Sequence, residues 1–259
     1  MNIVLLGSGN VATHLGRALK KAGENIIQVW SRTESNAQIL ADELEAEIAS
    51  DLAIINPTAD IYILAVKDDV IQEVGENLPP LQNGVLIHTS GSTEMNILKG
   101  LSSKIGVFYF PQTFSKIKPI DFKTTPIAVE GNLPEVVHLL KSIAERLSDK
   151  VIEISAFQRM NLHMAAVFAC NFTNHLYHLA EEILKENQLD LDLLRPIILE
   201  TAAKIQTNRP VEVQTGPAIR GDQKTINKHL ELLENNPGIL ALYTKLSQSI
   251  AAAKADTIS

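Results

Sequence analysis

The sequence predicts an α/β domain with a doubly wound sheet, followed by an all-α domain. Three observations predict this division. Short apolar runs alternate with helical patterns up to Ile154, a glycine-rich turn follows the first of these runs, and the strand signal stops after Ile154. Such alternation is typical of parallel sheets that are covered by helices on both faces. We therefore expect one domain over residues 1–154 and a second over residues 155–259.

The first domain contains short apolar segments bounded by turn residues, as expected of strands buried on both faces of a parallel sheet. The predicted strands are Ile3–Leu6, Ile26–Trp30, Ile61–Val66, Val85–His88, Val107–Phe110, Pro126–Val129 and Val151–Ile154. The predicted helices between them are Val11–Ala22, Ser35–Leu44, Asp68–Asn77 and Glu135–Leu147. Strands and helices in this order form right-handed βαβ units, which build a doubly wound sheet.

The second half of the chain predicts helices alone. Residues Ala156–Glu186 contain no proline or glycine and predict one long helix. Further helices are predicted at Leu191–Gln206 and Gln223–Glu234, the latter capped by Asp222. A last helix is expected to begin at Pro237, because proline is favoured in the first turn of a helix.

Composition and charge argue against several classes of protein. The chain carries 23 basic and 30 acidic residues, and its net charge of −7 argues against a nucleic-acid partner. No apolar run reaches the roughly 18 residues that a membrane span needs, and the N-terminus lacks the pattern of a signal peptide. Cys170 is the only cysteine, so no internal disulfide can form, and we expect a cytoplasmic protein.

The first predicted strand leads into Gly7-Ser8-Gly9-Asn10-Val11-Ala12, which opens the first predicted helix. Gly7 permits a tight turn, Gly9 lets the backbone approach a pyrophosphate, and Ala12 lets the helix pack closely on the strand. A pyrophosphate would sit at the helix N-terminus, where free N–H groups and the helix dipole favour an anion. The motif predicts a Rossmann domain with Gly7, Gly9, Asn10 and Val11 as cofactor-binding residues. The alternative is a tight strand–helix turn without a ligand.

The end of the second predicted strand indicates which dinucleotide is bound. An acidic residue there would bind the ribose 2′-hydroxyl of NAD, but the chain has Trp30-Ser31-Arg32-Thr33 at this point. Hydroxyl groups can donate hydrogen bonds to a 2′-phosphate, and the Arg32 guanidinium matches phosphate geometry. We therefore expect NADP, bound by Ser31 and Arg32. The alternative is that Ser31 and Thr33 only cap the next helix.

Ligands of open α/β sheets bind at the carboxyl ends of the strands, and two further strand ends are polar. Val66 and Lys67 are expected to pass under the nicotinamide half of the cofactor. His88 and Ser90 offer hydrogen-bonding groups after a neighbouring strand and are candidate substrate-binding residues, although they could instead be structural.

The long predicted helix carries a second group of candidates. At 100° per residue, His163 and Asn174 differ by about 20° after full turns and share a face, while Asn171 lies on its flank at about 80°. Hydride transfer to a C=O or C=N bond needs a proton donor, so His163 is the candidate acid or base. Asn171 is a second candidate catalytic residue and Asn174 a candidate substrate contact; a structural role is the alternative for both His163 and Asn171. The nearby histidines lack the spacing and the acidic companion of a metal site, so no metal is expected.

The segment Thr215-Gly216-Pro217-Ala218-Ile219-Arg220-Gly221-Asp222 is a polar loop that opens a helix. Arg220 and the backbone donors of such a loop can receive an anionic group. Thr215 and Arg220 are therefore candidate substrate-binding residues, and the substrate is expected to be a small anionic molecule. The alternative is a plain connection between two helices.

Together these motifs resemble one family. The residues that carry the resemblance are Gly7–Ala12, Ser31-Arg32, His88–Gly91, Pro111–Phe114, the helix with His163 and Asn171, and Thr215–Asp222. The family consists of bacterial proteins with a Rossmann-like domain followed by a helical domain of unknown function, which are described as NADP oxidoreductases. They are similar to pyrroline-5-carboxylate reductase and belong with the 6-phosphogluconate dehydrogenase-like superfamily. The resemblance implies a helical domain that forms a homodimer, with the active cleft between the domains.

The leading hypothesis is an NADP(H)-dependent oxidoreductase that transfers a hydride between nicotinamide and a small carbonyl or imine substrate. A second hypothesis is a non-catalytic NADP(H)-binding sensor or scaffold protein, which would lack an ionisable group near the nicotinamide. A third is a structural dimer that no longer binds a nucleotide. The sequence does not distinguish these three.

Overall fold

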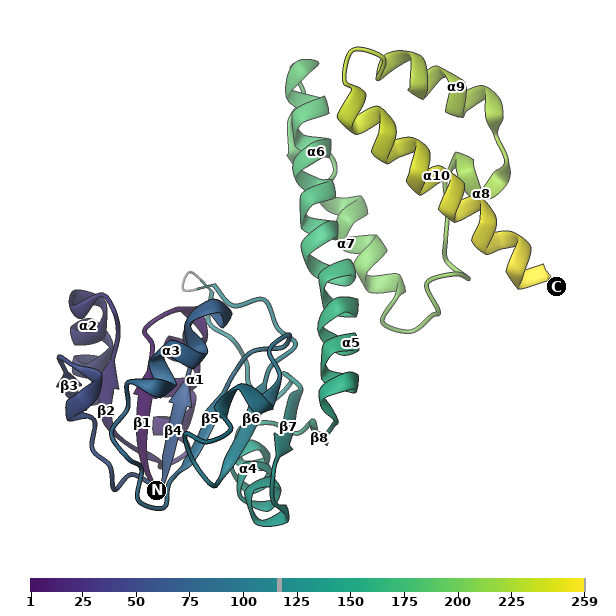
Figure 1. Cartoon of the computed structure of the whole chain (residues 1–259). Coiled ribbons are helices and arrows are strands. Elements are labelled where there is room, and N and C mark those ends of the chain that lie inside the picture. The colour runs from purple at the N-terminus through teal and green to yellow at the C-terminus, as the bar shows by residue number, and fades with distance from the viewer. Residues whose placement is uncertain (116–117, 259) are drawn as a thin grey trace. The chain divides into compact units, whose positions relative to one another are not determined.

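The computed structural model describes residues 1–115 and 118–258 (Figure 1). The chain divides into two compact units, Met1–Phe172 and Thr173–Ser259. The first unit holds the sheet and the second is helical, which confirms the predicted fold class. The predicted domain boundary at residue 154 stays a prediction, because the first compact unit continues past the sheet into the helical residues 156–172.

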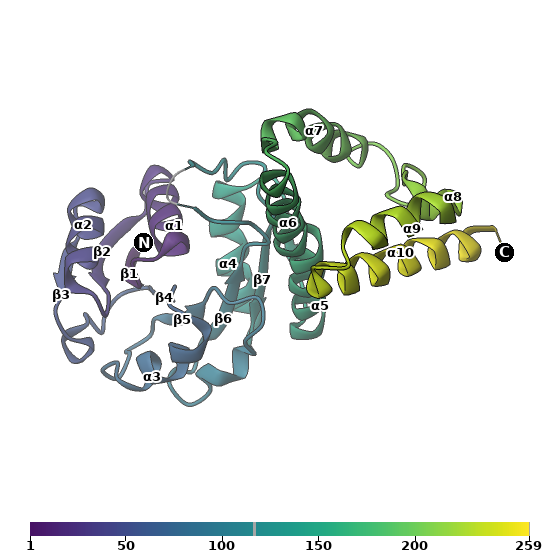
Figure 2. The same cartoon turned by 90° about the horizontal axis from the view of Figure 1, so that it is seen from above.

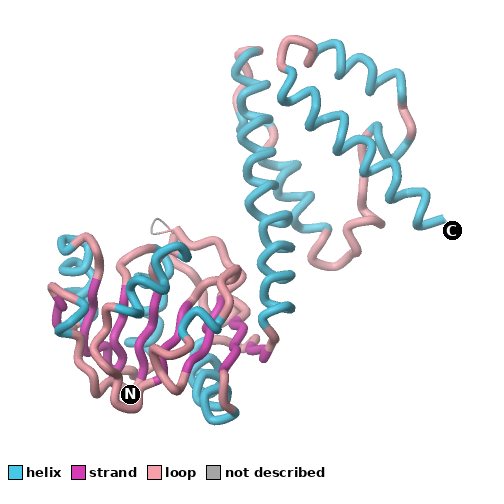
Figure 3. Tube along the Cα trace, in the orientation of Figure 1, coloured by secondary structure: helices cyan, strands magenta, loops and turns pink. Residues whose placement is uncertain are grey.

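The sheet has the strand order β3-β2-β1-β4-β5-β6-β7-β8 (Figure 3). The strands are β1 (Asn2–Leu6), β2 (Asn25–Trp30), β3 (Glu47–Ala49), β4 (Ile61–Leu64), β5 (Val85–His88), β6 (Ile105–Tyr109), β7 (Ile127–Gly131) and β8 (Val151–Glu153). Neighbouring strands from β3 to β6 are all parallel, so their carboxyl ends meet at one edge of the sheet. This is the doubly wound arrangement, in which ligands bind at that edge.

Two strands differ from the prediction. β3 was not predicted, and it pairs with β2 at the edge of the sheet. β7 was predicted as a strand of a parallel sheet, but it runs antiparallel to β6, while β8 is parallel to β7. No helix joins β6 to β7 in the described residues, and antiparallel neighbours do not need one.

The core lies on both faces of the sheet, and β1 contributes to each. Ile3 and Leu5 pack with the side chains of α1 (Asn10–Lys21), α2 (Glu34–Leu44) and α4 (Pro134–Leu147). Val4 and Leu6 point to the other face and pack with those of α3 (Ile71–Glu76). Figure 2 shows α1 and α2 on one side of the sheet and α3 on the other. Full burial of each such side chain stabilises the fold by about 1.5–3 kcal/mol, which holds the carboxyl edge of the sheet in place.

The predicted long helix is present, with one departure from regular α geometry. It comprises α5 (Ala156–Ala166), a π-helical segment (Val167–Phe172) and α6 (Thr173–Glu186). A capping box starts α5, since the Ser155 hydroxyl accepts a hydrogen bond from the Gln158 N–H and the Gln158 side chain accepts one from the Ser155 N–H. Likewise, the predicted helix Asp68–Asn77 begins as a 3₁₀ turn over Asp68–Val70 before α3.

The second unit continues with α7 (Arg195–Lys204), α8 (Pro217–Arg220), α9 (Gln223–Leu232) and α10 (Pro237–Ile258). The predicted cap of α9 is confirmed, because Asp222 accepts a hydrogen bond from the Thr225 N–H at 3.1 Å. The short helix α8 lies where the sequence predicted only a loop. Ala218 is the only buried hydrophobic residue described in this unit. Among the described residues, no helix is long and apolar enough to cross a membrane.

Candidate functional site

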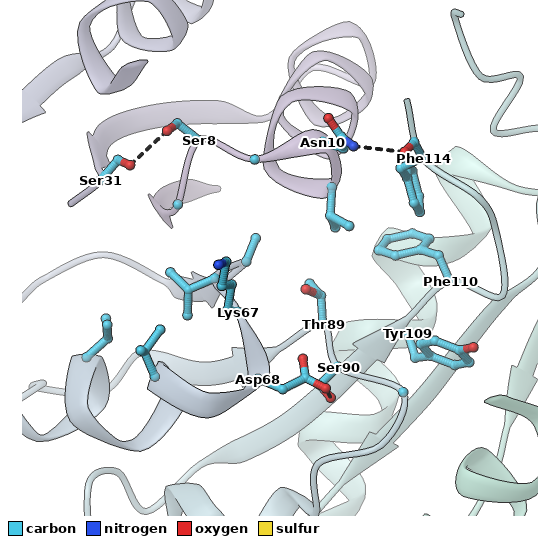
Figure 4. Close-up of a pocket in the computed structure, with 18 of the residues that line it drawn as sticks. Ser8, Asn10, Ser31, Lys67, Asp68, Thr89, Ser90, Tyr109, Phe110 and Phe114 are labelled. Carbon is cyan, nitrogen blue, oxygen red and sulfur yellow. Dashed lines mark hydrogen bonds between the residues drawn. The ribbon is translucent and has the colours of Figure 1, made fainter. Parts of the chain in front are cut away.

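A cavity of about 980 Å³ opens at the carboxyl edge of the sheet, and all the residues that line it belong to the first unit. It extends from the turn after β1 and the end of β2 to the loop after β5, the end of β6 and the helical residues 163–171. Figure 4 shows Ser8 and Ser31 at one end of this pocket and Ser90 and Tyr109 at the other. Its volume is at the upper end of the range of small-molecule and cofactor sites, roughly 300–1,000 Å³.

The turn between β1 and α1 is shaped by two glycines that act in different ways. Gly7 has a φ of 126°, and a Cβ at this position would lie 2.3 Å from the carbonyl oxygen of Ala65. A side chain is therefore excluded by both backbone conformation and space. Gly9 precedes α1 and has no side-chain cap, and a Cβ there would meet nothing within 4 Å. The space in front of the helix N-terminus is thus left open, and its N–H groups face a position suited to an anion.

The end of β2 supplies polar and cationic groups to the same end of the cavity. Ser31, Arg32 and Thr33 all line it, and the Ser8 hydroxyl donates a hydrogen bond to the Ser31 hydroxyl at 2.8 Å. Arg32 is exposed and has no ion pair among the residues that the structure describes. Its guanidinium is therefore available to an anionic ligand, and its role in binding a 2′-phosphate stays a prediction.

The loop after β5 lines the opposite end of the cavity. Thr89, Ser90 and Gly91 line the cavity, together with Lys67 and Asp68 from the segment that follows β4. The Ser90 hydroxyl is buried and donates a hydrogen bond of 2.6 Å to the Asp68 carboxylate, which also accepts one from Ser92 at 2.7 Å. Asp68 therefore ties this loop to the 3₁₀ turn that follows β4.

Arg159 fastens the same loop from the other side, and the sequence did not predict this role. It is the largest fully buried side chain described, at 1% exposure. One terminal nitrogen, Nη1, donates to the backbone carbonyls of Ser90, Gly91 and Thr93 at 3.1, 3.1 and 2.8 Å. Its Nε donates to the carboxylate of Glu130 in β7 at 3.2 Å. The guanidinium thus ties the first turn of α5 to both the loop and the sheet.

One turn further along α5, His163 meets Tyr109, another residue that the sequence did not predict. The Tyr109 hydroxyl lies 3.2 Å from Nδ1 of His163, and the two rings meet edge to face. Burial raises the pKa of the Tyr109 phenol, although the nearby Arg159 charge acts in the opposite direction. Both side chains line the cavity, and a Cβ on Gly91 would lie 2.6 Å from His163 Nδ1 and 2.7 Å from the Tyr109 ring. The absence of a side chain at Gly91 is what allows the pair to meet.

The π-helical segment brings further residues to the cavity. Val167, Cys170 and Asn171 all line it. Single π turns inside α-helices are frequent at functional sites, and the extra residue changes the direction of the side chains that follow. Asn171 therefore lies in the same cavity as His163, where a substrate would be accessible to both.

Some predicted residues lie elsewhere. His88 is fully buried and does not line the cavity, and its Nδ1 accepts a hydrogen bond from the Ser90 N–H at 3.2 Å. Burial, together with the Arg159 charge, lowers the pKa of His88 from 6.5 to about 4, so the ring is neutral at pH 7. Asn174, Thr215 and Arg220 belong to the second unit and are not among the lining residues. The substrate-binding roles of these four residues stay predictions.

Comparison with known proteins identifies the family of this chain. Residues 2–91 match the family described as NADP oxidoreductase coenzyme F420-dependent, and residues 125–250 match a domain of unknown function, DUF2520. A "putative NADP oxidoreductase" of Bacteroides fragilis is 45% identical, with a TM-score of 0.89, over 97% of this chain and 98% of that one. This chain belongs to the same family of NADP oxidoreductases. The family resemblance that the sequence predicted is therefore confirmed.

Solved structures of lower identity share the fold. A pyrroline-5-carboxylate reductase of Streptococcus pyogenes is 16% identical, with 98% of each chain covered and a TM-score of 0.65. A reductive aminase of Aspergillus terreus, in complex with NADPH and ethyl-5-oxohexanoate, is 14% identical with a TM-score of 0.66, over 98% of this chain and 91% of that one. At these identities the likeness shows a common architecture of a Rossmann-like sheet followed by helices.

Proposed function

We propose that this protein is an NADP(H)-dependent oxidoreductase that transfers a hydride between nicotinamide and a small carbonyl or imine substrate. One observation carries the proposal: a single cavity joins an open helix N-terminus and a free arginine at one end to a histidine–tyrosine pair at the other. The first end suits a phosphate-bearing dinucleotide, and the second suits proton transfer. When bound, NADPH would supply the hydride from its nicotinamide ring.

The residues of the cofactor end fit an NADP molecule. Gly7 and Gly9 leave the backbone bare, so that the N–H groups of Asn10 and Val11 can approach the pyrophosphate. Ser31 and Arg32 would bind the 2′-phosphate through a hydroxyl and a guanidinium. Val66 and Lys67 line the cavity between its two ends, where the nicotinamide half would pass.

At the other end, His163 would hold and transfer the proton that accompanies the hydride. In the reducing direction its ring nitrogen would donate a proton to the substrate oxygen or nitrogen, and in the oxidising direction it would accept one. Asn171, with an amide that both donates and accepts hydrogen bonds, would orient the substrate. The relatives named as a reductive aminase and a pyrroline-5-carboxylate reductase make C=N bonds reasonable substrates to test beside C=O bonds.

The second unit would complete the protein as a homodimer. It buries only Ala218 among its described hydrophobic residues, while Leu199 and Leu232 are 71% and 82% exposed. Helices with so small a core need a partner to cover their apolar faces, and a second copy of this chain is the proposed partner. Thr215, Arg220 and Asn174 would then contact an anionic substrate. Sedimentation equilibrium at micromolar concentration should give twice the mass of the chain, and a purely monomeric, helical protein would contradict this.

Nucleotide binding is tested by thermal unfolding with NADPH. A ligand that binds the native state stabilises it by roughly 2.7 kcal/mol at 100 times its Kd. The variant Gly9→Asp places a carboxylate in open space at the anion site, so it should fold normally and lose this stabilisation. Gly238→Asp, which adds the same group to the first turn of α10, is the matched control and should keep it. Equal stabilisation of both variants would refute the proposed cofactor site.

Catalysis is tested separately, by following NADPH oxidation with a panel of small ketones, keto acids and cyclic imines. The panel should include oxidised coenzyme F420, because the family description names it. His163→Ala should bind NADPH like the parent and lose turnover by a factor of about 10²–10⁴. A protein that binds NADPH but turns over no substrate would instead be the sensor or scaffold of the second hypothesis.

A further inference from the structure

We propose that Tyr109 is a positioning residue whose hydroxyl holds the imidazole of His163 in its working orientation. The inference rests on the proposed function, in which His163 exchanges a proton with the substrate. It follows from the geometry of three groups: the Tyr109 hydroxyl at 3.2 Å from His163 Nδ1, the edge-to-face contact of the two rings, and the bare backbone of Gly91 between them.

Tyr109 is itself held firmly, which a positioning residue requires. It is the last residue of β6, is 5% exposed and packs in a small cluster with Val107 and Ala128. His163 lies on α5, and a Cβ on Gly91 would lie 2.6 Å from its Nδ1. A rigid strand therefore presents the hydroxyl, and the helix presents the ring that must be oriented. Without the hydroxyl, the imidazole would be free to rotate about its side-chain bonds.

A phenol hydroxyl is suited to this role because it both donates and accepts hydrogen bonds. Nδ1–H of His163 can donate to the hydroxyl oxygen both in the protonated ring and in the neutral ring that has lost its Nε2 proton, and in the other neutral tautomer the hydroxyl can donate to Nδ1. The contact therefore persists as the proton comes and goes at Nε2, the nitrogen without a hydrogen bond among the described residues. In the reducing direction the Nε2–H bond breaks, a new bond to hydrogen forms on the substrate, and the Nδ1 proton stays with the ring.

Tyr109 is not the proton source in this arrangement. Burial raises the pKa of its phenol, so a tyrosinate in this position would be unfavourable. The charge of the Arg159 guanidinium lies close to Tyr109, but this group already donates hydrogen bonds to Glu130 and to the loop carbonyls. The hydroxyl proton therefore stays on Tyr109, and its effect on catalysis passes through His163.

The test is Tyr109→Phe, which removes the hydroxyl and keeps the ring. Tyr62→Phe is the matched control, because Tyr62 is also buried and its hydroxyl bonds to the backbone of Asn56 and Ala59, away from the cavity. With a substrate from the panel, Tyr109→Phe should lower kcat about tenfold and leave the KM for NADPH within twofold. Tyr62→Phe should change neither.

A double-mutant cycle distinguishes positioning from direct catalysis. In a His163→Ala background, Tyr109→Phe should cause no further loss of turnover. A loss that persists in that background would mean that Tyr109 acts on the substrate itself, and an unchanged kcat in the single variant would mean that the hydroxyl has no role. Either result would overturn the proposal.

Aromatic ¹H–¹³C NMR spectra test the contact without any turnover. The Cε1–H and Cδ2–H signals of His163, assigned from the spectrum of His163→Ala, should shift or broaden in Tyr109→Phe and stay in place in Tyr62→Phe. If no substrate is found, these spectra still decide the question, so failure of the proposed function and failure of this inference are separate results. Unchanged His163 signals in Tyr109→Phe would overturn the inference.

Discussion

The buried Arg159 offers a direct test of how this fold fixes its site. We consider Arg159→Met, which keeps a long unbranched side chain and removes the guanidinium. In the native structure this group donates hydrogen bonds to the carbonyls of Ser90, Gly91 and Thr93 and to the carboxylate of Glu130. The substitution leaves three backbone acceptors and one carboxylate without their donor, and methionine supplies only apolar contacts in return.

The expected loss follows from the burial of these partners. Removing one member of a buried ion pair costs about 3–5 kcal/mol, because the remaining charge is left uncompensated. The Glu130 side chain is 15% exposed, and the exposed Ser92 shows that the loop lies close to water, so part of the loss can be relieved. We therefore expect the lower end of the range, about 3 kcal/mol. That corresponds to a fall on the order of 100-fold in the folding equilibrium constant.

Urea unfolding, followed by circular dichroism, measures this loss. Arg17→Met is the matched control, because Arg17 also pairs with a glutamate, Glu43, but 46% and 39% of the two side chains are exposed. An exposed pair of this kind contributes only about 0.2–1 kcal/mol. If Arg159→Met destabilises the protein no more than Arg17→Met does, then the guanidinium does not secure the loop and the reasoning is wrong.

Three further predictions concern pH, cofactor choice and the histidine–tyrosine pair. The pKa of His88 is about 4 in the folded state and 6.5 in the unfolded state, so on acidification the unfolded state takes up the proton at a higher pH than the folded state. The free energy of unfolding therefore has its full value above pH 6.5 and falls by about 3 kcal/mol toward pH 4. Urea unfolding at pH 7 and 4.5 should show this loss in the parent and not in His88→Asn. Arg32→Ala should weaken NADPH binding by about 10- to 100-fold, since a hydrogen bond to a charged group contributes about 1.5–3 kcal/mol; titration calorimetry with NADH should show no change. Gly91→Ala should push the His163 and Tyr109 rings apart and lower turnover about tenfold at unchanged NADPH affinity, and normal turnover would contradict the close approach.

The sequence predicted most of the sheet because strands that are buried on both faces of a parallel sheet consist almost entirely of apolar residues. The four central strands appear as continuous apolar runs, and their residues are buried on both faces. The edge strand β3 has only the three residues Glu47, Ile48 and Ala49, which is too short to show a period. Periodicity does not indicate the direction of a strand, so β7 was predicted but its antiparallel direction was missed. A signal was available, because a parallel neighbour needs a long crossover and no helix was predicted between Phe110 and Pro126.

The cofactor end of the site was predictable because its determinants are contiguous in sequence. Gly7 and Gly9 act through the local backbone, and Ser31 and Arg32 lie directly at the end of a strand. The other end depends on tertiary contacts. Arg159 lies on a helix and acts on a loop that is 66 to 69 residues away in sequence, which no local pattern reveals.

The ends of the strands gave a second signal: the residues predicted at the end of β5 were His88, which is buried away from the cavity, and Ser90, which lines it. His88 is the last residue of β5 and has a partner strand on each side, opposite Leu64 and Val107, so it is buried. The residues that reach the cavity come immediately after it. Tyr109 is likewise the last residue of β6, but it lines the cavity, where its hydroxyl lies 3.2 Å from His163 Nδ1. A polar tip on an otherwise apolar strand end was the available clue to this residue.

The π-helical segment explains why Asn171, which regular helix geometry put on the flank of His163, lines the same cavity. In a regular helix the two residues differ by eight positions, or about 80° after full turns. A π turn inserts one extra residue, so Asn171 takes the angular place of the residue before it, at about −20° from His163. The same insertion removes the angular argument that placed Asn174 with His163, because every later position is turned by about 100°. Helical periodicity alone therefore does not give the relative directions of His163, Asn171 and Asn174, since the irregular turn Val167–Phe172 lies between His163 and Asn174.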